Sequence, residues 1–322
     1  MAESHISPVK PESKPMLEKL KKALCAVYCS LLPTKKDNFK QIAIKLLFII
    51  SIIVMIVSSA YLVKYFSNTV EQQQLVDNSR EIWYDKKLNT KERFAELRKE
   101  NYDFSGWLTV SGTNIDNPVY QHTDDSFYLN HDQRQQPDEH GTLYLSADDV
   151  IDKNGQDKNL VIYGHNMTDG TMFGTLKRYR NLDFFKKNPA VSFSTVYGDD
   201  IYKVFAVFLV DATETAPEDF DIRRSKFSYT AFCEWMDGVK ERSIINTGVE
   251  VEYEDRMLTL VTCADDFENA RLVVMARILH ENEAIKTFAD AAIANPSPRY
   301  PEGWYKKHSL EYPYDKQSLK EK

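Results

Sequence analysis

A thiol and a guanidinium are brought together by the segment MLTLVTCADDFENAR, residues 257–271. An apolar run ends at Thr262 and Cys263, and after a short polar loop Arg271 opens a second apolar run, LVVMARIL. Two strands joined by a short loop pair antiparallel, so the end of the first would lie beside the start of the second. A fixed positive charge favours the thiolate, which is the nucleophilic form of cysteine. Taken alone, the segment also fits a cysteine that only fills the core.

A cysteine nucleophile needs a base or an imidazolium partner, and the chain contains seven histidines. His165 is the candidate because it ends the β-type run VIYGH and precedes a glycine-containing loop, NMTDGTMFG. Functional residues concentrate where regular elements end in loops. The polar surroundings of His122, His131 and His140 predict solvated surface side chains instead.

The four cysteines do not form a disulfide scaffold, and no CxxC or Cys/His spacing predicts a metal site. We therefore expect neither a metal nor another cofactor. Cys233 borders the apolar face of a predicted helix and is expected to be a buried apolar thiol, so a disulfide with Cys263 is disfavoured. Cys25 and Cys29 lie in residues 16–32, which predict either a basic amphipathic helix on a membrane surface or a short cytoplasmic tail.

Residues 42–63 predict a transmembrane anchor. From Leu46 to Val63 they include eighteen uncharged residues, which as a helix would span roughly 27 Å, close to the hydrocarbon thickness of a bilayer. Lysines flank the N-terminal side of this run, so the positive-inside rule places the N-terminus in the cytoplasm and everything after Lys64 outside the cell. A cleaved signal peptide with a small-residue site at 58–60 is the competing interpretation, but the run is long for a signal core.

The predicted anchor divides the chain into parts of different charge. We expect a cytoplasmic basic tail (1–41), the transmembrane anchor (42–63), a helical stalk (64–104), a catalytic barrel (105–281) and a C-terminal extension (282–322). The first 45 residues carry nine Lys against four acidic residues, whereas the whole chain has a net charge of −7, so the remainder is strongly acidic. An acidic main body argues against nucleic acid as a partner.

Short β-type runs separated by turn signals follow from Gly106 onward. They are WLTVSG, IDNPVY, GTLYLS, NLVIYGH, two runs on either side of Gly198 within 190–211, VEVEY (249–253), MLTLVTC and RLVVMARILH. About eight strands at this close spacing favour a closed β-barrel over a doubly wound sheet. One helix is predicted at 226–242. Its apolar face would contain Phe232, Trp235, Met236 and Val239.

Two further segments flank the predicted barrel. Residues 70–101 predict one or two helices that break near Asn89 and Thr90, where either residue would cap the second helix. The tail, residues 281–322, predicts a flexible terminus. Alternatively, its aromatic residues, which include Tyr300 and Trp304, would pack back on the barrel or bind cell-wall polymer.

Together, the histidine, cysteine and arginine motifs resemble the sortases, membrane-anchored cysteine transpeptidases of Gram-positive bacteria. TLVTC (259–263) matches the family's TLxTC strand end, Arg271 follows on the next strand, and His165 matches the family's upstream histidine. The YGHNM segment and the helix at 226–242 resemble class B in particular. The resemblance covers roughly residues 106–279. It implies a mostly β fold, a closed eight-stranded sortase-like β-barrel with N-terminal helices and one inserted helix, preceded by a single transmembrane helix.

The resemblance also implies a reaction. Cys263 would attack the Thr carbonyl of a C-terminal sorting motif in a secreted protein and form a thioester, while His165 protonates the leaving amine. Arg271 would hold the substrate and stabilise the oxyanion, and Thr262 would assist through its hydroxyl or backbone. An amine of the cell-wall precursor, lipid II or peptidoglycan, would then resolve the thioester. The sorting motif would be NPxTN-like or LPxTG-like.

Three alternatives to this reaction stay open from the sequence. A pilin-polymerising sortase would use a pilin lysine as the acceptor, and a non-catalytic anchored β-barrel would serve adhesion or assembly. An L,D-transpeptidase is disfavoured, because its His-Gly-Cys type of motif is absent before Cys263. The acidic loop ADDFENA (264–270) opposes thiolate formation. We expect this loop to be solvated, with recognition of an amine or a cation as its alternative role.

Overall fold

The computed structural model describes residues 31–213 and 220–314. Residues 1–30, with Cys25, Cys29 and nearly all of the predicted basic segment 16–32, lie outside the described residues. The helices are α2 (Phe39–Trp83), α3 (Thr90–Glu100), α4 (Leu182–Lys187), α5 (Tyr229–Arg242) and α6 (Glu302–Lys307), with 3-10 helices η1 (Phe127–Leu129) and η2 (Leu176–Arg180). The strands are β1 (Phe104–Val110), β2 (Asp116–Tyr120), β3 (Tyr144–Leu145), β4 (Ile151–Asp152), β5 (Gly155–Gln156), β6 (Asn159–Tyr163), β7 (Ala190–Thr195), β8 (Gly198–Asp211), β9 (Ile245–Asn246), β10 (Met257–Cys263), β11 (Ala270–Ile278) and β12 (Ile293–Ala294).

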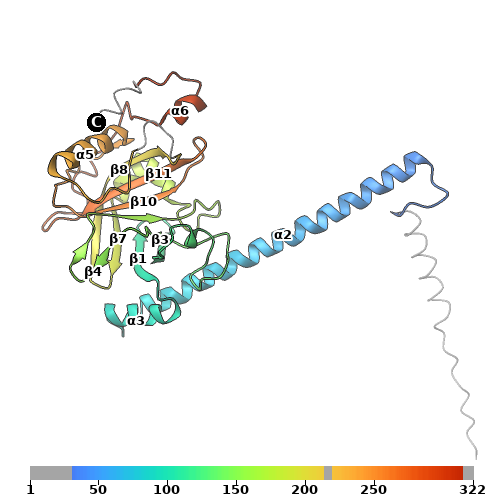
Figure 1. Cartoon of the computed structure of the whole chain (residues 1–322), viewed down its shortest axis with the longest axis horizontal. Helices are drawn as coiled ribbons and strands as arrows, with labels where there is room; N and C mark the ends of the chain where they lie inside the picture. Colours follow the sequence, from blue (N-terminus) through green and yellow to red (C-terminus); the bar gives the residue numbers. More distant parts are fainter. Residues whose placement is uncertain (1–30, 214–219, 315–322) are drawn as a thin grey trace, which may run out of the picture. The chain divides into compact units, whose positions relative to one another are not determined.

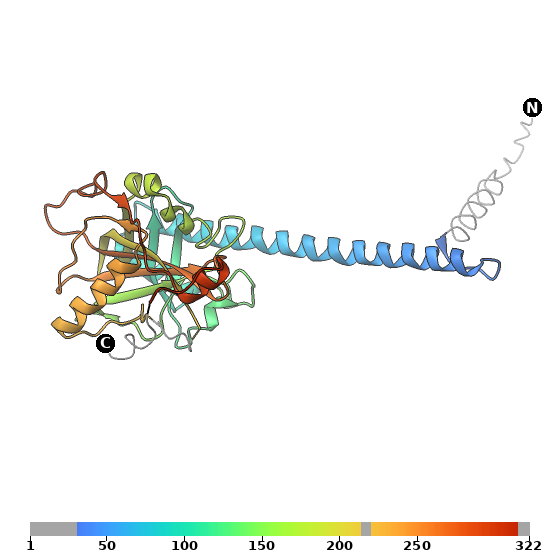
Figure 2. The same ribbon diagram turned by 90° about the horizontal axis from the view of Figure 1, so that it is seen from above.

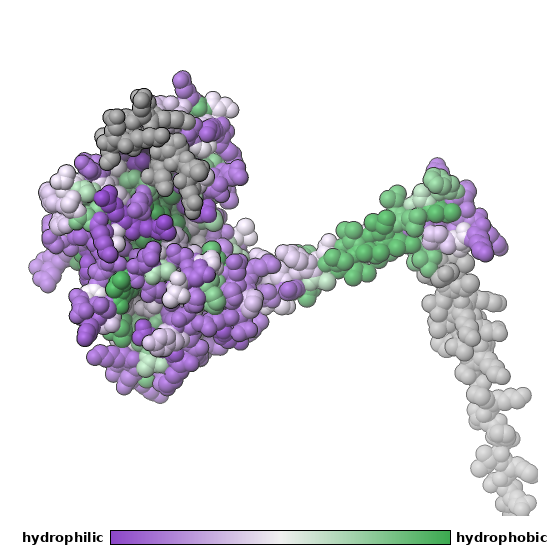
Figure 3. Space-filling view, in the orientation of Figure 1, coloured by the Kyte–Doolittle hydropathy of each residue, from purple (hydrophilic) through white to green (hydrophobic). Residues whose placement is uncertain are grey.

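Helix α2 carries no charged residue from Leu46 to Val63, and the face of this part that Figure 3 shows is a continuous hydrophobic band. The helix begins after Asn38, whose side chain accepts from the Gln41 N–H at 2.9 Å while the Gln41 side chain accepts from the Asn38 N–H at 3.0 Å. This reciprocal pair satisfies backbone donors that a helix start leaves free. Among the described helices, α2 is long and apolar enough to cross a membrane.

The chain divides into two compact units between Val70 and Glu71, and the C-terminal part of α2 belongs to the second unit. There Leu75, Val76 and Trp83 are buried, and the Trp83 ring stacks on Trp107 of β1 with centroids 5.1 Å apart. Helix α3 follows after a short break. Its N-cap is Asn89, which forms a capping box with Glu92, so the break predicted near Asn89 and Thr90 is confirmed.

Eight strands close into a barrel in the order β1-β2-β3-β6-β10-β11-β8-β7. Figures 1 and 2 show this barrel from two directions. The predicted closed, eight-stranded barrel is therefore confirmed. Strand β10 is central to the site, because it pairs in parallel with β6 on one side and antiparallel with β11 on the other. The two runs on either side of Gly198 do form a hairpin, β7 and β8, but its turn lies at residues 196–197, because Gly198 already pairs with Thr195 as the first residue of β8.

Strands β8 and β11 are buried on both faces because α5 covers the outside of this part of the barrel. Along β11, Leu272, Val274 and Ala276 join the barrel core, while Val273 and Met275 pack in a second cluster with α5. This two-residue alternation is the normal consequence of strand geometry. The predicted inserted helix is α5, capped by Ser228. Its predicted apolar face is confirmed, since Phe232, Trp235, Met236 and Val239 are all buried.

The strand predicted for VEVEY (249–253) is wrong, because these residues, which all belong to the described part of the chain, form no strand. Their backbone groups bond to side chains instead: the Arg277 guanidinium donates to the Glu250 carbonyl at 2.9 Å, and the Glu252 N–H donates to Asp255 at 2.7 Å. The apolar residues Val249 and Val251 still contribute to the cluster beneath α5. The alternation therefore reflects burial of one side of an irregular segment and no β-ladder.

Candidate active site

The β10–β11 hairpin sets Cys263 directly opposite Arg271, as cross-strand partners at the end of the ladder. Side chains of directly opposed residues lie on the same face of a sheet. Cys263 is a free, exposed thiol, and Arg271 is half-buried and donates to the Ala270 carbonyl at 3.0 Å. The predicted pairing of Cys263 with Arg271 at one end of the sheet is therefore present, and Cys263 is not a core residue.

His165 reaches the same end of the barrel because β6 runs parallel to β10. The last pair in the register is Tyr163 with Val261, so two residues further on each chain stand His165 and Cys263. Beyond the ladder two hydrogen bonds keep the chains together: the Gly164 N–H donates to the Val261 carbonyl at 3.2 Å, and the Thr262 hydroxyl donates to the Gly164 carbonyl at 2.7 Å. The buried Thr262 side chain thus links the strand end that carries His165 to the strand end that carries Cys263, which is consistent with an auxiliary role.

The orientation of the His165 ring is set by η1. Its Nε2 lies 2.7 Å from the Leu129 carbonyl oxygen. A carbonyl only accepts hydrogen bonds, so Nε2 carries a proton and Nδ1 is the nitrogen that gains or loses one. The loop after His165 is closed by a hydrogen bond from the Phe173 N–H to the His165 carbonyl at 2.9 Å. Leu129 was not found from the sequence, because a backbone carbonyl carries no residue-type signal.

Two tyrosines line the site beside the candidate residues. Tyr144 of β3 and Tyr163 of β6 stack with ring centroids 5.3 Å apart. Tyr163 pairs with Val261, two residues before Cys263, and Tyr144 pairs with Tyr163. Burial raises the pKa of both phenols. Both phenols therefore stay neutral at physiological pH and offer hydrogen-bonding groups on an aromatic wall. The sequence marked these residues only as strand positions.

The three histidines predicted to be solvated, His122, His131 and His140, have partners other than Cys263 and Arg271. His140 contradicts the predicted solvated position, because it is 2% exposed and its Nδ1 lies 2.7 Å from Asp138. His122 and His131 are partly exposed and stack on either side of Phe127. The polar residues around His140 predicted exposure, but one of them, Asp138, is the hydrogen-bond partner that allows the imidazole to be buried. Cys233 lies in α5 as a free thiol, and it is half-buried against the apolar cluster beneath that helix, so the fully buried position expected for it is wrong.

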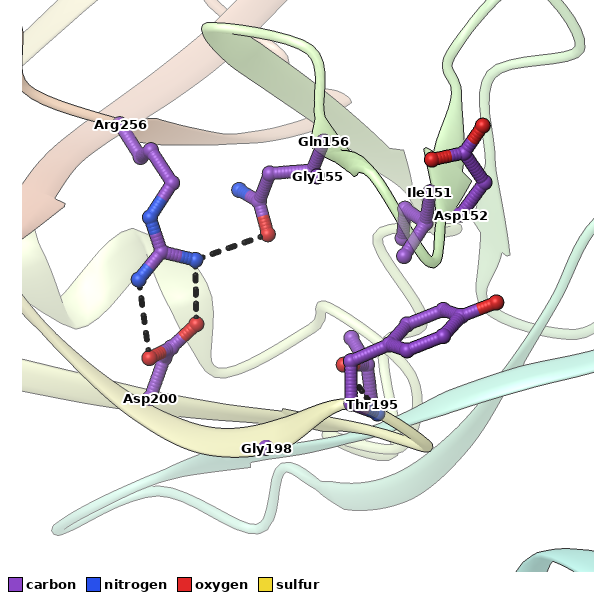
Figure 4. A pocket seen from close by; sticks show the side chains of 9 residues that line it. Ile151, Asp152, Gly155, Gln156, Thr195, Gly198, Asp200 and Arg256 are labelled. Atoms are coloured by element: carbon purple, nitrogen blue, oxygen red, sulfur yellow. Dashed lines mark hydrogen bonds and ion pairs between the residues drawn. The ribbon is translucent and has the colours of Figure 1, made fainter.

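A cavity of about 260 Å³ lies at the opposite end of β10 and is drawn in Figure 4. Arg256, one residue before β10, points across it and pairs with both Asp200 oxygens at 2.6 and 3.0 Å. It also donates to the Gln156 side chain at 3.1 Å. The length of β10, roughly 20 Å at about 3.3 Å per residue, separates this cavity from Cys263. Among the residues that line this cavity, Arg256 carries the positive charge, and Asp200 already neutralises it. We therefore do not place the active site in this cavity.

Comparisons with known proteins agree with this geometry. A family model described as Sortase domain matches residues 108–279. Sortase B of Listeria monocytogenes is 31% identical over 194 residues, which cover 59% of this chain and 75% of that protein. A solved Staphylococcus aureus sortase B–substrate complex superposes with a TM-score of 0.59 at 26% identity, covering 67% of this chain and 98% of that chain. A sortase B structure complexed with triglycine gives a TM-score of 0.58, 26% identity and coverages of 67% and 99%.

Proposed function

Because this chain belongs to the sortase family and is a cysteine transpeptidase of the sortase B type, we propose that Cys263 is its nucleophile, His165 its proton donor and Arg271 its oxyanion-stabilising residue. The convergence of β6, β10 and β11 at one end of the barrel is the observation that carries this assignment. Each of the three residue types suits its role: a thiolate attacks carbonyls, an imidazolium donates a proton, and a guanidinium keeps its charge.

The reaction follows from these positions. The Cys263 thiolate attacks the carbonyl carbon of a Thr in the sorting motif, and the Arg271 guanidinium stabilises the negative oxygen that forms. When the peptide bond breaks, the leaving nitrogen takes the proton from Nδ1 of His165, and a thioester remains on Cys263. An acceptor amine then attacks the thioester, His165 removes its proton, and the thiolate leaves. Thr262 acts by holding the Gly164 carbonyl, and with it the strand end that carries His165.

The substrates we propose are secreted proteins with a C-terminal sorting motif of the NPxTN or LPxTG type, and the acceptor is an amine of lipid II or peptidoglycan. Support comes from the relatives, since one sortase B structure holds a substrate and another holds triglycine. We further propose that residues 42–63 anchor the enzyme in the cell membrane, with the N-terminus in the cytoplasm and the catalytic unit outside.

A peptide assay with the full chain in detergent tests this function. Fluorogenic NPxTN- and LPxTG-type peptides would be offered with and without triglycine. Wild type is expected to cleave one of them and to form a triglycine adduct, with a thioester on Cys263 detectable by mass spectrometry. Cys263→Ala and His165→Ala should lower kcat/KM at least about 10³-fold, and Arg271→Lys about 10²-fold, since Lys lacks the planar fork. Unchanged cleavage by Cys263→Ala and His165→Ala would refute the proposal.

A further inference from the structure

The C-terminal segment returns to the barrel after the family match ends at residue 279. Strand β12 pairs with β9, so the chain is first held beside the end of α5. The Asn295 N–H then donates to the Ile244 carbonyl at 2.9 Å, and the Arg299 N–H donates to the Glu241 carbonyl at 2.8 Å. Helix α6 begins shortly afterwards, and both ribbon views draw it beside the end of the β10–β11 hairpin (Figures 1 and 2). We call residues 299–307 the C-terminal clamp.

The clamp rests on the loop that joins Cys263 to Arg271. Phe267 of this loop is only 7% exposed and belongs to the barrel core, against which Tyr300 and Trp304 also pack. The Phe267 ring lies so close to Gly303 that a Cβ at that position would be 2.6 Å from Phe267 Cδ2. The absence of a side chain at Gly303 is therefore what lets α6 sit on the ring.

An ion pair ties the same loop to the segment that follows His165. Both Asp266 oxygens accept from the Arg180 guanidinium, at 2.7 and 2.9 Å. Arg180 is the last residue of η2, which follows the loop that begins at His165. The solvated loop expected from the sequence is wrong at Asp266 and Phe267.

We propose that Gly303, Phe267 and the Arg180–Asp266 pair are positioning residues, which hold the β10–β11 loop so that Cys263 stays opposite Arg271 and level with His165. Two backbone hydrogen bonds close the loop on itself, from the Ala264 N–H to the Ala270 carbonyl at 3.0 Å and from the Ala270 N–H to the Phe267 carbonyl at 3.2 Å. The Asn269 carbonyl of the loop also accepts from the Ala212 N–H at 3.0 Å. The clamp and the ion pair attach the loop on two further sides. This inference rests on the proposed roles of Cys263, His165 and Arg271.

Gly303→Ala is the first test, with Gly198→Ala as its control. A Gly→Ala change inside a helix is normally stabilising, but at Gly303 the new methyl displaces Phe267. Gly198 is the first residue of β8, directly after the β7–β8 turn, and nothing lies within 4 Å of an added Cβ. In the full chain, Gly303→Ala should lower kcat for peptide cleavage about tenfold while KM changes less than about twofold, because misplacement of reacting groups acts on the chemical step. Gly198→Ala should match wild type.

Alkylation by iodoacetamide gives a second measurement that needs no substrate. Peptide mass spectrometry would follow Cys263 alone. If Gly303→Ala displaces the β10–β11 loop, the rate constant for alkylation of Cys263 at one fixed pH should change about threefold or more, because the surroundings of the thiol change. Phe267→Leu, which makes room for the methyl, should restore most of kcat and of the alkylation rate in the double variant. A Gly303→Ala enzyme with wild-type kcat and alkylation rate, or a double variant no better than the single one, would overturn the proposal.

Charge reversal tests the other attachment. Arg180→Asp and Asp266→Arg should each lower kcat about three- to tenfold, and the double variant should recover, because the pair is restored in the opposite sense. Because the Arg180 side chain is 41% exposed, the melting temperature of these variants should change little. A loss of activity that is explained entirely by the fraction of unfolded protein would contradict a positioning role. If wild type cleaves no sorting peptide, the proposed function fails, whereas the alkylation rates of Cys263 still decide the proposal on the clamp.

Discussion

At the scale of single residues, the site depends on backbone atoms as much as on the reacting side chains. The Leu129 carbonyl fixes the proton on His165 Nε2 and leaves Nδ1 to exchange protons. The Gly164 carbonyl receives the buried hydroxyl of Thr262 and thereby fixes the spacing of the two strand ends. Orientation of this kind is what allows an imidazole to act on a leaving group within a restricted geometry.

The Thr262 hydroxyl provides a residue-scale prediction. Thr262→Val keeps the shape of the side chain but removes the donor to the buried Gly164 carbonyl. We expect a loss of stability of about 1–3 kcal/mol, the usual cost of leaving such a group unpaired, and a roughly tenfold lower kcat/KM because His165 follows Gly164 directly. Thr262→Ser, which keeps the hydroxyl, is the control and should stay within about twofold of wild type. Urea unfolding and peptide cleavage measure the two effects, and equal behaviour of Val and Ser would contradict the role given to the hydroxyl.

At the scale of elements, the hairpin of β10 and β11 was predictable because its two apolar runs are adjacent in sequence and its pairing is local. The same reasoning predicted the β7–β8 hairpin and the apolar face of α5. The contact of His165 with Leu129 was not predictable, since the two residues are 36 positions apart and meet only when the barrel closes. The contact of the C-terminal clamp with Phe267 forms only because the chain after β12 passes along the end of α5 and returns to the barrel. No local sequence pattern predicts such a long-range contact.

Burial of charged residues was also hidden from the sequence. Lys203 of β8 and Arg277 of β11 lie inside the molecule, where Glu283 pairs with both. An alternating pattern marks such positions as solvent-facing, so the sequence offers no reason to bury them. Their pairing makes burial possible, because a buried charge without a partner is strongly unfavourable.

The pairing of Glu283 predicts a pH dependence of stability. Burial alone would raise the pKa of Glu283, but hydrogen bonds from Arg277 and Lys203 outweigh it and lower the pKa to about 2. The pKa in the unfolded chain is about 4.3, so the pair stabilises the fold fully above about pH 5 and this contribution is lost as the pH falls towards 2. Glu283→Gln should cost about 2 kcal/mol at pH 7, less than a fully buried pair because Glu283 keeps 12% of its side chain exposed.

Urea unfolding of residues 71–322 at pH 7 and pH 3 measures this effect. The difference between wild type and Glu283→Gln should shrink at pH 3, where Glu283 is mostly protonated in the unfolded chain and its pairing contributes less. Glu281→Gln serves as the control, because Glu281 is exposed and lies two residues away. A difference that stays constant with pH would show that the glutamine acts through packing and that ionic pairing of Glu283 is not responsible.

At the scale of the whole molecule, the apolar half of α2 and the lysines before it predict the orientation of the enzyme in the membrane. Lys35, Lys36 and Lys40 precede the apolar run, and within the first unit Lys45 pairs with Asp37 at 2.8 Å. Positive charges beside a span are retained in the cytoplasm. Protease added to intact cells should therefore digest a C-terminal tag and the catalytic unit while an N-terminal tag survives on a membrane-bound fragment. Replacement of the three lysines by Glu should yield a mixed orientation, and digestion of the N-terminal tag in the unchanged chain would reverse the proposed topology.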